Sequence, residues 1–205
     1  MFWAADLRAA GPPPARSAVR VDEVTTVSAP AVAAAMGGEG DLVAQRMARA
    51  CRCFGAWLGP EVAAYGWLSA GPEWIGELGL EVRPGHREAY VWNCVTLPAS
   101  RRKGVFQALL LCIAAHVKRE GLVRLWIGSV NGVGEKAIAQ AGFVPVLRFR
   151  TMSLQFRLGG LRWLQVRAVE DVEAGLMAAA LGVLGRGGRP LRLGASLHLA
   201  EIRRH

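Results

Sequence analysis

The order of apolar and basic segments between residues 89 and 119 constrains the fold more than any other feature of the chain. The segment 89–97, AYVWNCVTL, is almost unbroken in its apolar character, which is typical of a central β-strand covered on both faces. Residues 98–104, PASRRKG, then bring two arginines, a lysine and a glycine. From 105 to 119 the apolar residues recur with helical spacing, at Phe106, Leu109, Leu110, Ile113 and Val117. The sequence therefore predicts a buried strand, a basic turn and an amphipathic helix in direct succession.

The basic turn has the features of an anion-binding site. Arg101, Arg102 and Lys103 are consecutive and repel one another, which favours an anionic partner beside them. A helix that begins near Val105 leaves the backbone amides of its first turn without intrahelical partners, and the positive end of its dipole attracts anions. Gly104 has no Cβ and lets an anion approach the backbone closely. The hypothesis is a phosphate-bearing ligand, and the alternative is a solvated basic turn that only caps the helix.

The remaining elements follow from hydrophobic periodicity and from turn residues. Three prolines predict a loop or mobile arm at 8–17. Strands are expected at 17–24, 51–59, 62–71, 74–83, 122–130, 143–158 and 161–167, of which the second and third form a β-hairpin. Helices are expected at 29–38, 40–50, 133–141 and 170–184.

The elements around the basic turn occur in a distinctive order. The loop is Arg101-x-x-Gly104-x-Phe106, with Pro98 three residues before its arginine. A strand-like segment follows the helix, and Asn131 then stands eleven residues before the dipeptide Gly142-Phe143. With this order and spacing, residues 51–158 resemble the GNAT superfamily of acyl-CoA-dependent N-acyltransferases, whose pyrophosphate loop is Arg/Gln-x-x-Gly-x-Gly/Ala.

The resemblance implies an α/β (α+β) fold in which a mixed, mostly antiparallel central sheet carries helices on both faces. It also implies acetyl-CoA as cosubstrate, without a metal. The strand before the loop would pair its backbone with the pantetheine arm, and Asn131 would contact the cosubstrate or cap its helix. The residues expected to bind the cosubstrate are Cys94, Val95, Thr96, Arg101, Arg102, Lys103, Gly104, Val105, Phe106 and Asn131.

Three positions depart from the family pattern. Phe106 replaces the small residue that ends the loop, so its ring is expected to point into the core rather than towards the diphosphate. Arg102 stands where many relatives have glycine, and Ile138 where many relatives have the tyrosine that protonates the departing thiolate. Because the positioning of two substrates can supply much of the rate, the loss of one general acid does not exclude an enzyme.

Candidate catalytic groups lie at the start of the 89–97 strand. Tyr90 occupies a position where some relatives carry a carboxylate base, and Glu88 lies on the same side by alternation. A tyrosine is protonated near neutral pH, so Tyr90 would more naturally orient a water molecule or a substrate. For Glu88 the alternative is a solvated surface position. A nucleophilic role is also conceivable for Cys94, but a buried thiol is the favoured interpretation.

Composition restricts the class of protein. The chain has 205 residues, of which 52% are hydrophobic and 20% charged, so a folded globular domain is expected. The net charge of +9 suits an anionic ligand, nucleic acid or a membrane surface, but a coding bias towards arginine would also produce it. The four cysteines form neither a zinc motif nor a disulfide framework, which indicates reduced thiols in the cytoplasm. Neither a secretion signal nor a membrane span is expected.

The sequence as a whole predicts a cytoplasmic, bacterial-type N-acetyltransferase that moves an acetyl group from acetyl-CoA to a primary amine. The domain is expected at 1–170, with its motif core at 51–158 and an N-terminal arm at 1–16. Residues 171–205 are expected to form a helical, basic extension that packs on the domain or on a partner subunit, which leaves a homodimer open. One alternative is an inactive acyl-CoA-binding sensor or assembly module. A nucleic-acid-binding protein is another alternative, but no recognised motif supports it, so neither nucleic acid nor membrane is expected as a partner.

Overall fold

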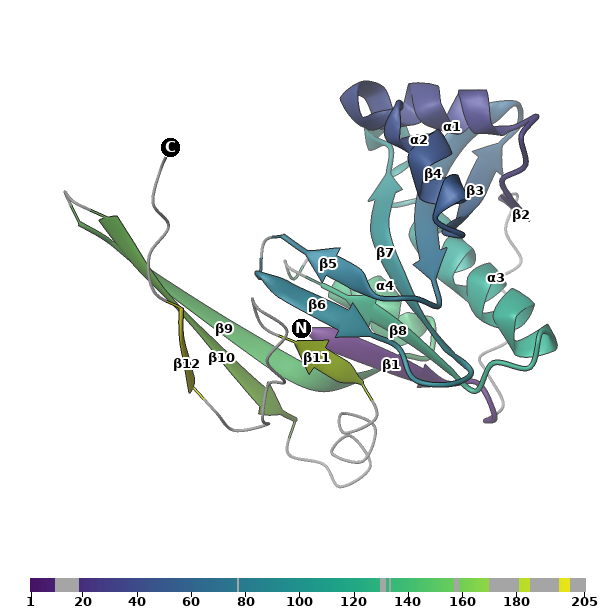
Figure 1. Cartoon of the computed structure of the whole chain (residues 1–205). Coiled ribbons are helices and arrows are strands. Elements are labelled where there is room, and N and C mark those ends of the chain that lie inside the picture. The colour runs from purple at the N-terminus through teal and green to yellow at the C-terminus, as the bar shows by residue number, and fades with distance from the viewer. Residues whose placement is uncertain are drawn as a thin grey trace.

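The centre of the fold is a nine-stranded mixed sheet (Figure 1). The structure is a computed structural model and describes residues 1–9, 19–76, 78–129, 132, 134–156, 159–169, 181–184 and 196–199. The strands lie in the order β12-β10-β9-β1-β8-β7-β4-β3-β2. Neighbours β7 and β8 are parallel, and the other neighbouring pairs of this sheet are antiparallel. Their bounds are β1 (Phe2–Asp6), β2 (Arg20–Glu23), β3 (Arg52–Leu58), β4 (Glu61–Ser69), β7 (Glu88–Thr96), β8 (Arg124–Gly128), β9 (Val144–Phe156), β10 (Gly159–Ala168) and β12 (Ser196–Leu199).

Helices α3 (Val105–Arg119) and α4 (Glu135–Gln140) cover one face of the sheet. The amphipathic helix expected at 105–119 is confirmed, and its inner face is fully buried at Leu109, Leu110, Ile113 and Val117. Just past the helix, Gly121 adopts φ +85°, a left-handed conformation that suits glycine at a helix C-terminus. Gly121 therefore explains where the helix ends.

Two separate layers cover the opposite face of the sheet. The helical segments α1 (Ala29–Met36), η1 (Gly37–Glu39) and α2 (Leu42–Ala48) lie over β3 and β4. A second sheet, formed by β5 (Glu73–Ile75), β6 (Leu80–Arg83) and β11 (Gly182–Leu184), lies over β1, β7 and β8. Trp92 of β7 packs against the hydrophobic clusters of both layers, so it marks the place where they meet. The expected fold class, a mostly antiparallel sheet between helices, is confirmed.

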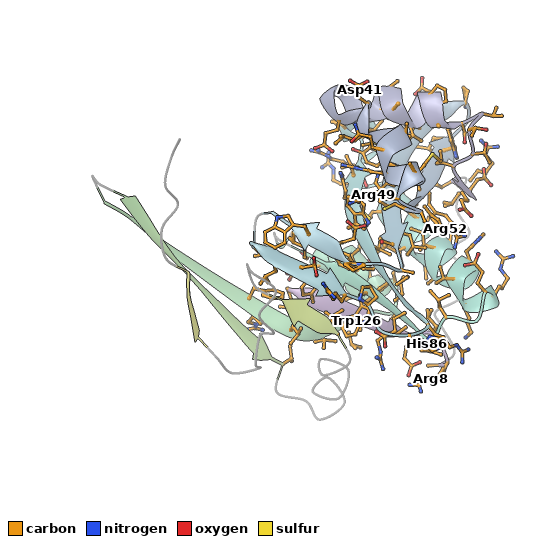
Figure 2. The ribbon with its side chains drawn as sticks, in the orientation of Figure 1. Arg8, Asp41, Arg49, Arg52, His86 and Trp126 are labelled. Atoms are coloured by element: carbon orange, nitrogen blue, oxygen red, sulfur yellow. The ribbon has the colours of Figure 1, made fainter. Side chains whose placement is uncertain are left out.

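An ion-pair network attaches the end of α3 to the sheet. The guanidinium of Arg52 on β3 donates to both carboxylate oxygens of Glu23, at 2.7 Å each, and to both of Glu120, at 2.6 and 2.9 Å. Arg52, labelled in Figure 2, holds the pKa of Glu23 and of Glu120 below the usual range by donating these hydrogen bonds. This anchor and the buried face of α3 together fix where the first turn of the helix lies.

The N-terminal segment begins with a strand. The arm expected at 1–16 is wrong for Phe2–Asp6, because these residues form β1 between β8 and β9. Alternate residues of β1 are buried in the clusters on the two faces of the sheet, Phe2 and Ala4 on one side and Trp3 and Ala5 on the other. A strand that is buried on both faces has no polar alternation, so this short apolar run carries a weak signal. Residues 10–18, which contain the three prolines, lie outside the described residues.

Three further expectations are corrected by strand pairing. The single strand expected at 74–83 is instead the hairpin of β5 and β6, because Gly79 adopts φ +64° and lets the chain turn between them. Within the helix expected at 170–184, residues 182–184 form β11 and pair with β6, a long-range contact that no local pattern encodes. Residues 170–180 lie outside the described part of the chain. The extension expected to be helical at 171–205 is also wrong for Ser196–Leu199, which form β12 and pair with β10. The remaining helices and strands occur where the sequence predicts them, with ends that differ by a few residues.

Strand β7 contains a β-bulge opposite Gly66 of β4. The pairing of the two strands shifts by one residue there, so Asn93 and Cys94 together oppose this one glycine. Asn93 adopts φ +43°, a left-handed conformation that asparagine tolerates better than most residues. A Cβ at Gly66 would lie 2.8 Å from the Sγ of Cys94. Glycine at this position therefore makes room for the bulge.

The bulge reverses the alternation of side chains along β7. Before it, Val91 packs in the cluster under α3 and Trp92 packs on the opposite face. After it, Cys94 packs in the cluster under α3 and Val95 packs on the opposite face. Without the extra residue, Cys94 would lie on the same face as Trp92, because side chains alternate with a period of two.

We predict that Gly66→Ala lowers the free energy of unfolding by about 1–3 kcal/mol, because the new methyl group overpacks the site against Cys94. Urea denaturation of the single and double variants measures this. The Gly66→Ala/Cys94→Ala variant should recover most of the loss, since the thiol is the obstacle. Gly71→Ala is the control, because its Cβ would come no closer than 3.8 Å to another side chain. Strictly additive effects of the two substitutions would contradict this account of the bulge.

Candidate functional site

Strands β7 and β8 form a fork. They pair in parallel only from Glu88 with Arg124 to Val91 with Ile127. Beyond that point β7 continues to Thr96 beside β4, while β8 stays beside β1 (Figure 1). Among the described residues, the edge of β7 that turns towards β8 has no strand partner over 92–96. An unpaired strand edge offers backbone N–H and C=O groups that an extended ligand can pair with.

The basic loop continues from the open end of this fork. A short turn, η2 (Pro98–Ser100), connects β7 to four exposed residues, Arg101, Arg102, Lys103 and Gly104. The Nε of Arg101 donates to the carbonyl oxygen of Thr96 at 3.4 Å, which holds the loop against the end of β7. Arg102 and Gly104 adopt φ +63° and +72°. The family glycine that Arg102 replaces thus corresponds to a left-handed position in this structure, where a side chain is strained.

The first turn of α3 lies directly behind the loop. Its first intrahelical hydrogen bond runs from the amide of Ala108 to the carbonyl of Gly104, at 3.0 Å. The amides of Val105, Phe106 and Gln107 precede that bond and have no carbonyl of the helix to donate to. The first turn contains no acidic residue. Backbone donors, the helix dipole and the adjacent cations therefore all favour an anion at this corner.

The structure also places the two unusual family positions. Phe106 is half-buried and packs against the core, and a Cβ at Gly134 would lie 3.4 Å from its ring. The ring is therefore directed towards the start of α4, as expected, and leaves the loop free. Ile138 is 2% exposed within the core, so its position supplies no proton donor. The N-cap of α4 is Gly134, and Asn131 lies outside the described residues.

The thiols of the chain are held in their neutral form. Burial raises the pKa of Cys94 to about 12, and the same cause raises the pKa of Cys53 to about 12. The thiol of Cys94 donates to the carbonyl of Trp92, with 3.8 Å between sulfur and oxygen. A nucleophilic cysteine needs a lowered pKa. The surroundings of Cys94 thus favour a packing role for its side chain.

Glu88 lies at the closed end of the fork. It is 6% exposed and accepts hydrogen bonds from Arg124, from the indole of Trp126 at 2.7 Å and from the amide of Gly85 at 3.2 Å. Trp126, labelled in Figure 2, lies beneath the small sheet that contains β5, β6 and β11. The carboxylate is thus buried among donors from β8 and from the turn before β7, at the opposite end of β7 from the basic loop.

Tyr90 lies nearer to the point where the fork opens. It is 4% exposed, and its ring meets the ring of Phe2 edge to face with 5.7 Å between centroids. Its hydroxyl group lies beside Gly128, the last residue of β8, where a Cβ would come within 2.9 Å of the oxygen. Tyr90 therefore lies at the apex of the fork, close to the point where the pairing of β7 with β8 ends, whereas Glu88 lies at the first pair of that region.

Sequence reasoning missed Asn93, the residue at the bulge in the middle of the fork. Its side-chain Nδ2 donates to the carboxylate of Glu39 at 3.1 Å, so it connects β7 to the turn between α1 and α2. Two signals were available in the sequence. One is a polar residue inside an otherwise apolar strand, and the other is Gly66 in the neighbouring strand, since glycine in a strand often marks a bulge.

The family follows from a comparison of sequences. A sequence profile of the Acetyltransferase (GNAT) family matches residues 29–142, more than half of the chain. The chain belongs to the GNAT family of acetyltransferases. The matched region extends from the start of α1 to the end of α4, so this GNAT domain contains the fork, the bulge and the basic loop. A search of curated proteins finds no match.

Solved structures of acetyltransferases resemble the chain at low sequence identity. The GCN5-related glucosamine N-acetyltransferase region of a fungal multi-domain β-N-acetylglucosaminidase aligns with a TM-score of 0.52 and 10% identity, over 70% of this chain but only 19% of that protein. A GNAT acetyltransferase from Brucella melitensis, in complex with acetyl-CoA, gives 0.46 and 12% over 89% and 96% of the two chains. The ribosomal-protein-S18-alanine N-acetyltransferase of Escherichia coli gives 0.45 and 16% over 65% and 79%. At 10% identity, the alignment with the glucosamine N-acetyltransferase region shows a shared fold and nothing more specific.

Two features are absent from the described residues. No helix among them is long and apolar enough to cross a membrane. No group of three or more His, Cys, Asp or Glu side chains within the same residues could hold a metal ion.

We predict that Arg102→Gly keeps or raises the free energy of unfolding, whereas Lys103→Gly lowers it. Arg102 has a positive φ that glycine adopts without strain, and Lys103 does not. Both substitutions remove one exposed cation from the same loop, so the charge effect cancels in the comparison. The gap between the two variants should be about 1 kcal/mol in chemical denaturation. An equal loss in both variants would mean that the left-handed position is not strained.

Proposed function

We propose that the protein is an acetyl-CoA-dependent N-acetyltransferase that transfers an acetyl group to a primary amine. One observation supports this more than any other: the unpaired edge of β7 leads directly into the basic loop and the first turn of α3. Acetyl-CoA has a matching form, because an extended pantetheine arm joins its thioester to a diphosphate. Membership of the GNAT family points in the same direction.

The residues of this chain fit such a cosubstrate. The loop offers its diphosphate the side chains of Arg101, Arg102 and Lys103 together with the amides that follow Gly104. The edge of β7 offers backbone groups of Cys94, Val95 and Thr96 to the pantetheine arm. Val105 and Phe106 would contribute amides rather than side chains, since the side chain of Val105 is buried and that of Phe106 packs against the core. A contact from Asn131 remains a prediction.

The chemistry needs few protein groups. The lone pair of the neutral amine attacks the thioester carbonyl carbon, and the C–N bond forms. The C–S bond then breaks, the electrons leave with sulfur, and the thiolate of coenzyme A takes up a proton. The nitrogen loses one proton as the amide forms. Backbone N–H groups at the unpaired edge of β7 would polarise the carbonyl, and holding the two substrates together would supply much of the remaining rate.

Of the two catalytic candidates, Tyr90 fits this reaction better. Its buried hydroxyl group lies at the apex of the fork, where the acyl group would lie, and we infer that it orients the amine or a water molecule that accepts the proton. The hydrogen bonds that Glu88 accepts favour another role. Its contacts with Arg124 and Trp126 join β7 to β8, so we infer that Glu88 fixes the closed end of the fork.

A cytoplasmic location remains part of this proposal. The described thiols of Cys51, Cys53, Cys94 and Cys112 are all free, which fits a reducing compartment. A homodimer also remains a prediction. In the C-terminal extension, β11 pairs with β6 and β12 pairs with β10, so these segments join the sheets of their own chain.

The alternative of a non-catalytic acyl-CoA-binding module has one observation in its favour. Ile138 is buried in the core at the position where many relatives carry the tyrosine that protonates the thiolate. Such a module would bind acetyl-CoA without forming acetylated product from any amine. Mass spectrometry of reactions with a broad panel of amines separates the two functions.

We predict that acetyl-CoA raises the melting temperature of the wild-type protein, because a ligand that binds only the folded state stabilises it by mass action. Arg101→Ala/Arg102→Ala should lose most of this shift. The control is Lys118→Ala/Arg119→Ala, which removes the same charge from exposed residues at the other end of α3 and should keep the shift. An equal reduction in both double variants would mean that only the net charge matters, and the proposed diphosphate site would be wrong.

We predict that Tyr90→Phe lowers kcat by about 10²-fold, because the amine or the water molecule that accepts its proton is no longer oriented. The affinity for acetyl-CoA should stay unchanged, because Tyr90 lies away from the basic loop. Steady-state kinetics with a coenzyme A thiol assay gives kcat, and calorimetric titration gives the affinity. A variant with wild-type kcat would remove Tyr90 from the mechanism.

A further inference from the structure

Arg46 of α2 lies over two neighbouring tryptophan rings on the face of the sheet opposite α3. It is only 9% exposed. The central carbon of its guanidinium lies 5.1 Å from the ring centroid of Trp67 and 4.8 Å from that of Trp92. The two rings are 6.0 Å apart and tilted by 34°. Cation–π contacts of this kind stabilise a buried arginine, but they satisfy none of its hydrogen-bond donors.

The hydrogen bonds of this cluster are incomplete. Nη2 of Arg46 donates to Glu39 at 3.0 Å, but Nη1 is buried without a partner among the described residues. The indole N–H groups of Trp67 and Trp92 are also buried without a hydrogen-bond partner among the described residues. A buried donor without a partner costs about 1–3 kcal/mol, and more when it is charged. Nη1 of Arg46 is a donor, so the group that would satisfy it is an acceptor, and the charge of Arg46 favours an anion.

The carboxylate of Glu39 satisfies only part of the hydrogen-bonding capacity of Arg46. One of its oxygens, Oε2, accepts from both Arg46 at 3.0 Å and Asn93 at 3.1 Å. Its side chain is 57% exposed and belongs to a short turn, GGEG, at residues 37–40. Arginine binds a free carboxylate best through two parallel hydrogen bonds, and Glu39 provides only one. A carboxylate from outside the chain can take the same two donors and also use Nη1.

The cluster adjoins the proposed reaction centre. Asn93 is the bulge residue of β7, on the unpaired side of the fork, and Trp92 marks the junction of the two layers that cover this face. Helix α3 and the basic loop belong to the other face, where the cosubstrate phosphates would lie. An amine whose own carboxylate binds at Arg46 would therefore approach the fork from the side opposite the diphosphate.

We propose that Arg46, Asn93, Trp67 and Trp92 form an acceptor subsite that binds the carboxylate of an amino acid, with Glu39 as the internal carboxylate that the acceptor displaces. The inference rests on the proposed acetyl transfer at the fork and specifies its substrate class. It distinguishes amino acids, which carry an amine and a carboxylate a few bonds apart, from amines that lack a negative charge.

The test uses matched acceptors that differ only in the carboxylate. The protein amino acids are compared with the amines that result from their decarboxylation, such as phenylalanine with phenethylamine and lysine with 1,5-diaminopentane. The measurements are kcat/KM at saturating acetyl-CoA and the melting temperature in the presence of coenzyme A. The wild-type protein should prefer the carboxylate-bearing member of at least one pair by about 10- to 100-fold, as expected for hydrogen bonds to a charged group.

Two variants at the site give opposite expectations. Arg46→Met should abolish the preference by raising the KM of the amino acid, while the melting shift with acetyl-CoA is kept. Glu39→Ala removes the internal competitor and should lower that KM several-fold, a gain that a purely structural role for Glu39 would not produce. The control is Arg20→Met on β2, because Arg20 also lies over a tryptophan, with 5.5 Å to the ring centroid of Trp57, but is exposed and away from the fork. It should keep the preference.

The measurements distinguish a failure of the carboxylate subsite from a failure of the proposed acetyl transfer. If acetyl-CoA fails to shift the melting temperature, the proposed function is wrong. If acetyl-CoA binds but no amino acid is preferred over its decarboxylated partner, the carboxylate subsite is wrong. A loss of kcat in Glu39→Ala with KM unchanged would assign Glu39 to proton transfer and also overturn the inference. If Arg46→Met does not fold, the response of KM to Glu39→Ala decides.

Discussion

The parallel pairing of β7 with β8 ends after a few residues, and the rest of the candidate site depends on where it ends. Up to Val91 the two strands share hydrogen bonds, and beyond it β7 follows β4 while β8 follows β1. Backbone groups inside a sheet normally pair with a neighbouring strand. Within the described part of the chain, one edge of a central strand is left without a strand partner, in the middle of the sheet rather than at its rim. The fold thereby combines a rigid support with an open backbone edge.

The bulge at Asn93 decides which side chains of β7 pack on each face of the sheet. It turns Cys94 into the core under α3 and leaves Trp92 and Asn93 to the layer that contains Arg46 and Glu39. The requirement for Gly66 is a direct consequence, since the thiol of Cys94 occupies the space of a Cβ there. One inserted residue thus separates a buried, unreactive side of β7 from a side with polar and charged neighbours.

Much of the arrangement of the basic loop and the first turn of α3 could be predicted from the sequence, because its determinants are local. A glycine, three cations and the first turn of an amphipathic helix are contiguous in the chain, and the structure places the cations of this segment at the surface. The role of Phe106 could also be predicted, because its position on the apolar stripe directs it inward. For Glu88 and Tyr90, only their alternation along β7 could be predicted from the sequence. Their different surroundings come from Arg124, Trp126 and Gly128, which a separate strand supplies.

By itself, the sequence determined the order of the elements, the amphipathic face of α3 and the basic turn before it, since each depends on spacing between near neighbours. Only the tertiary structure decided that Phe2–Asp6 forms a central strand, that β7 bulges at Asn93, and that Arg46, Trp67 and Trp92 meet. Each of these depends on pairing between segments that are far apart in the chain. Such contacts form where the total burial of several elements is most favourable. The pattern of residues within one segment cannot reveal that total.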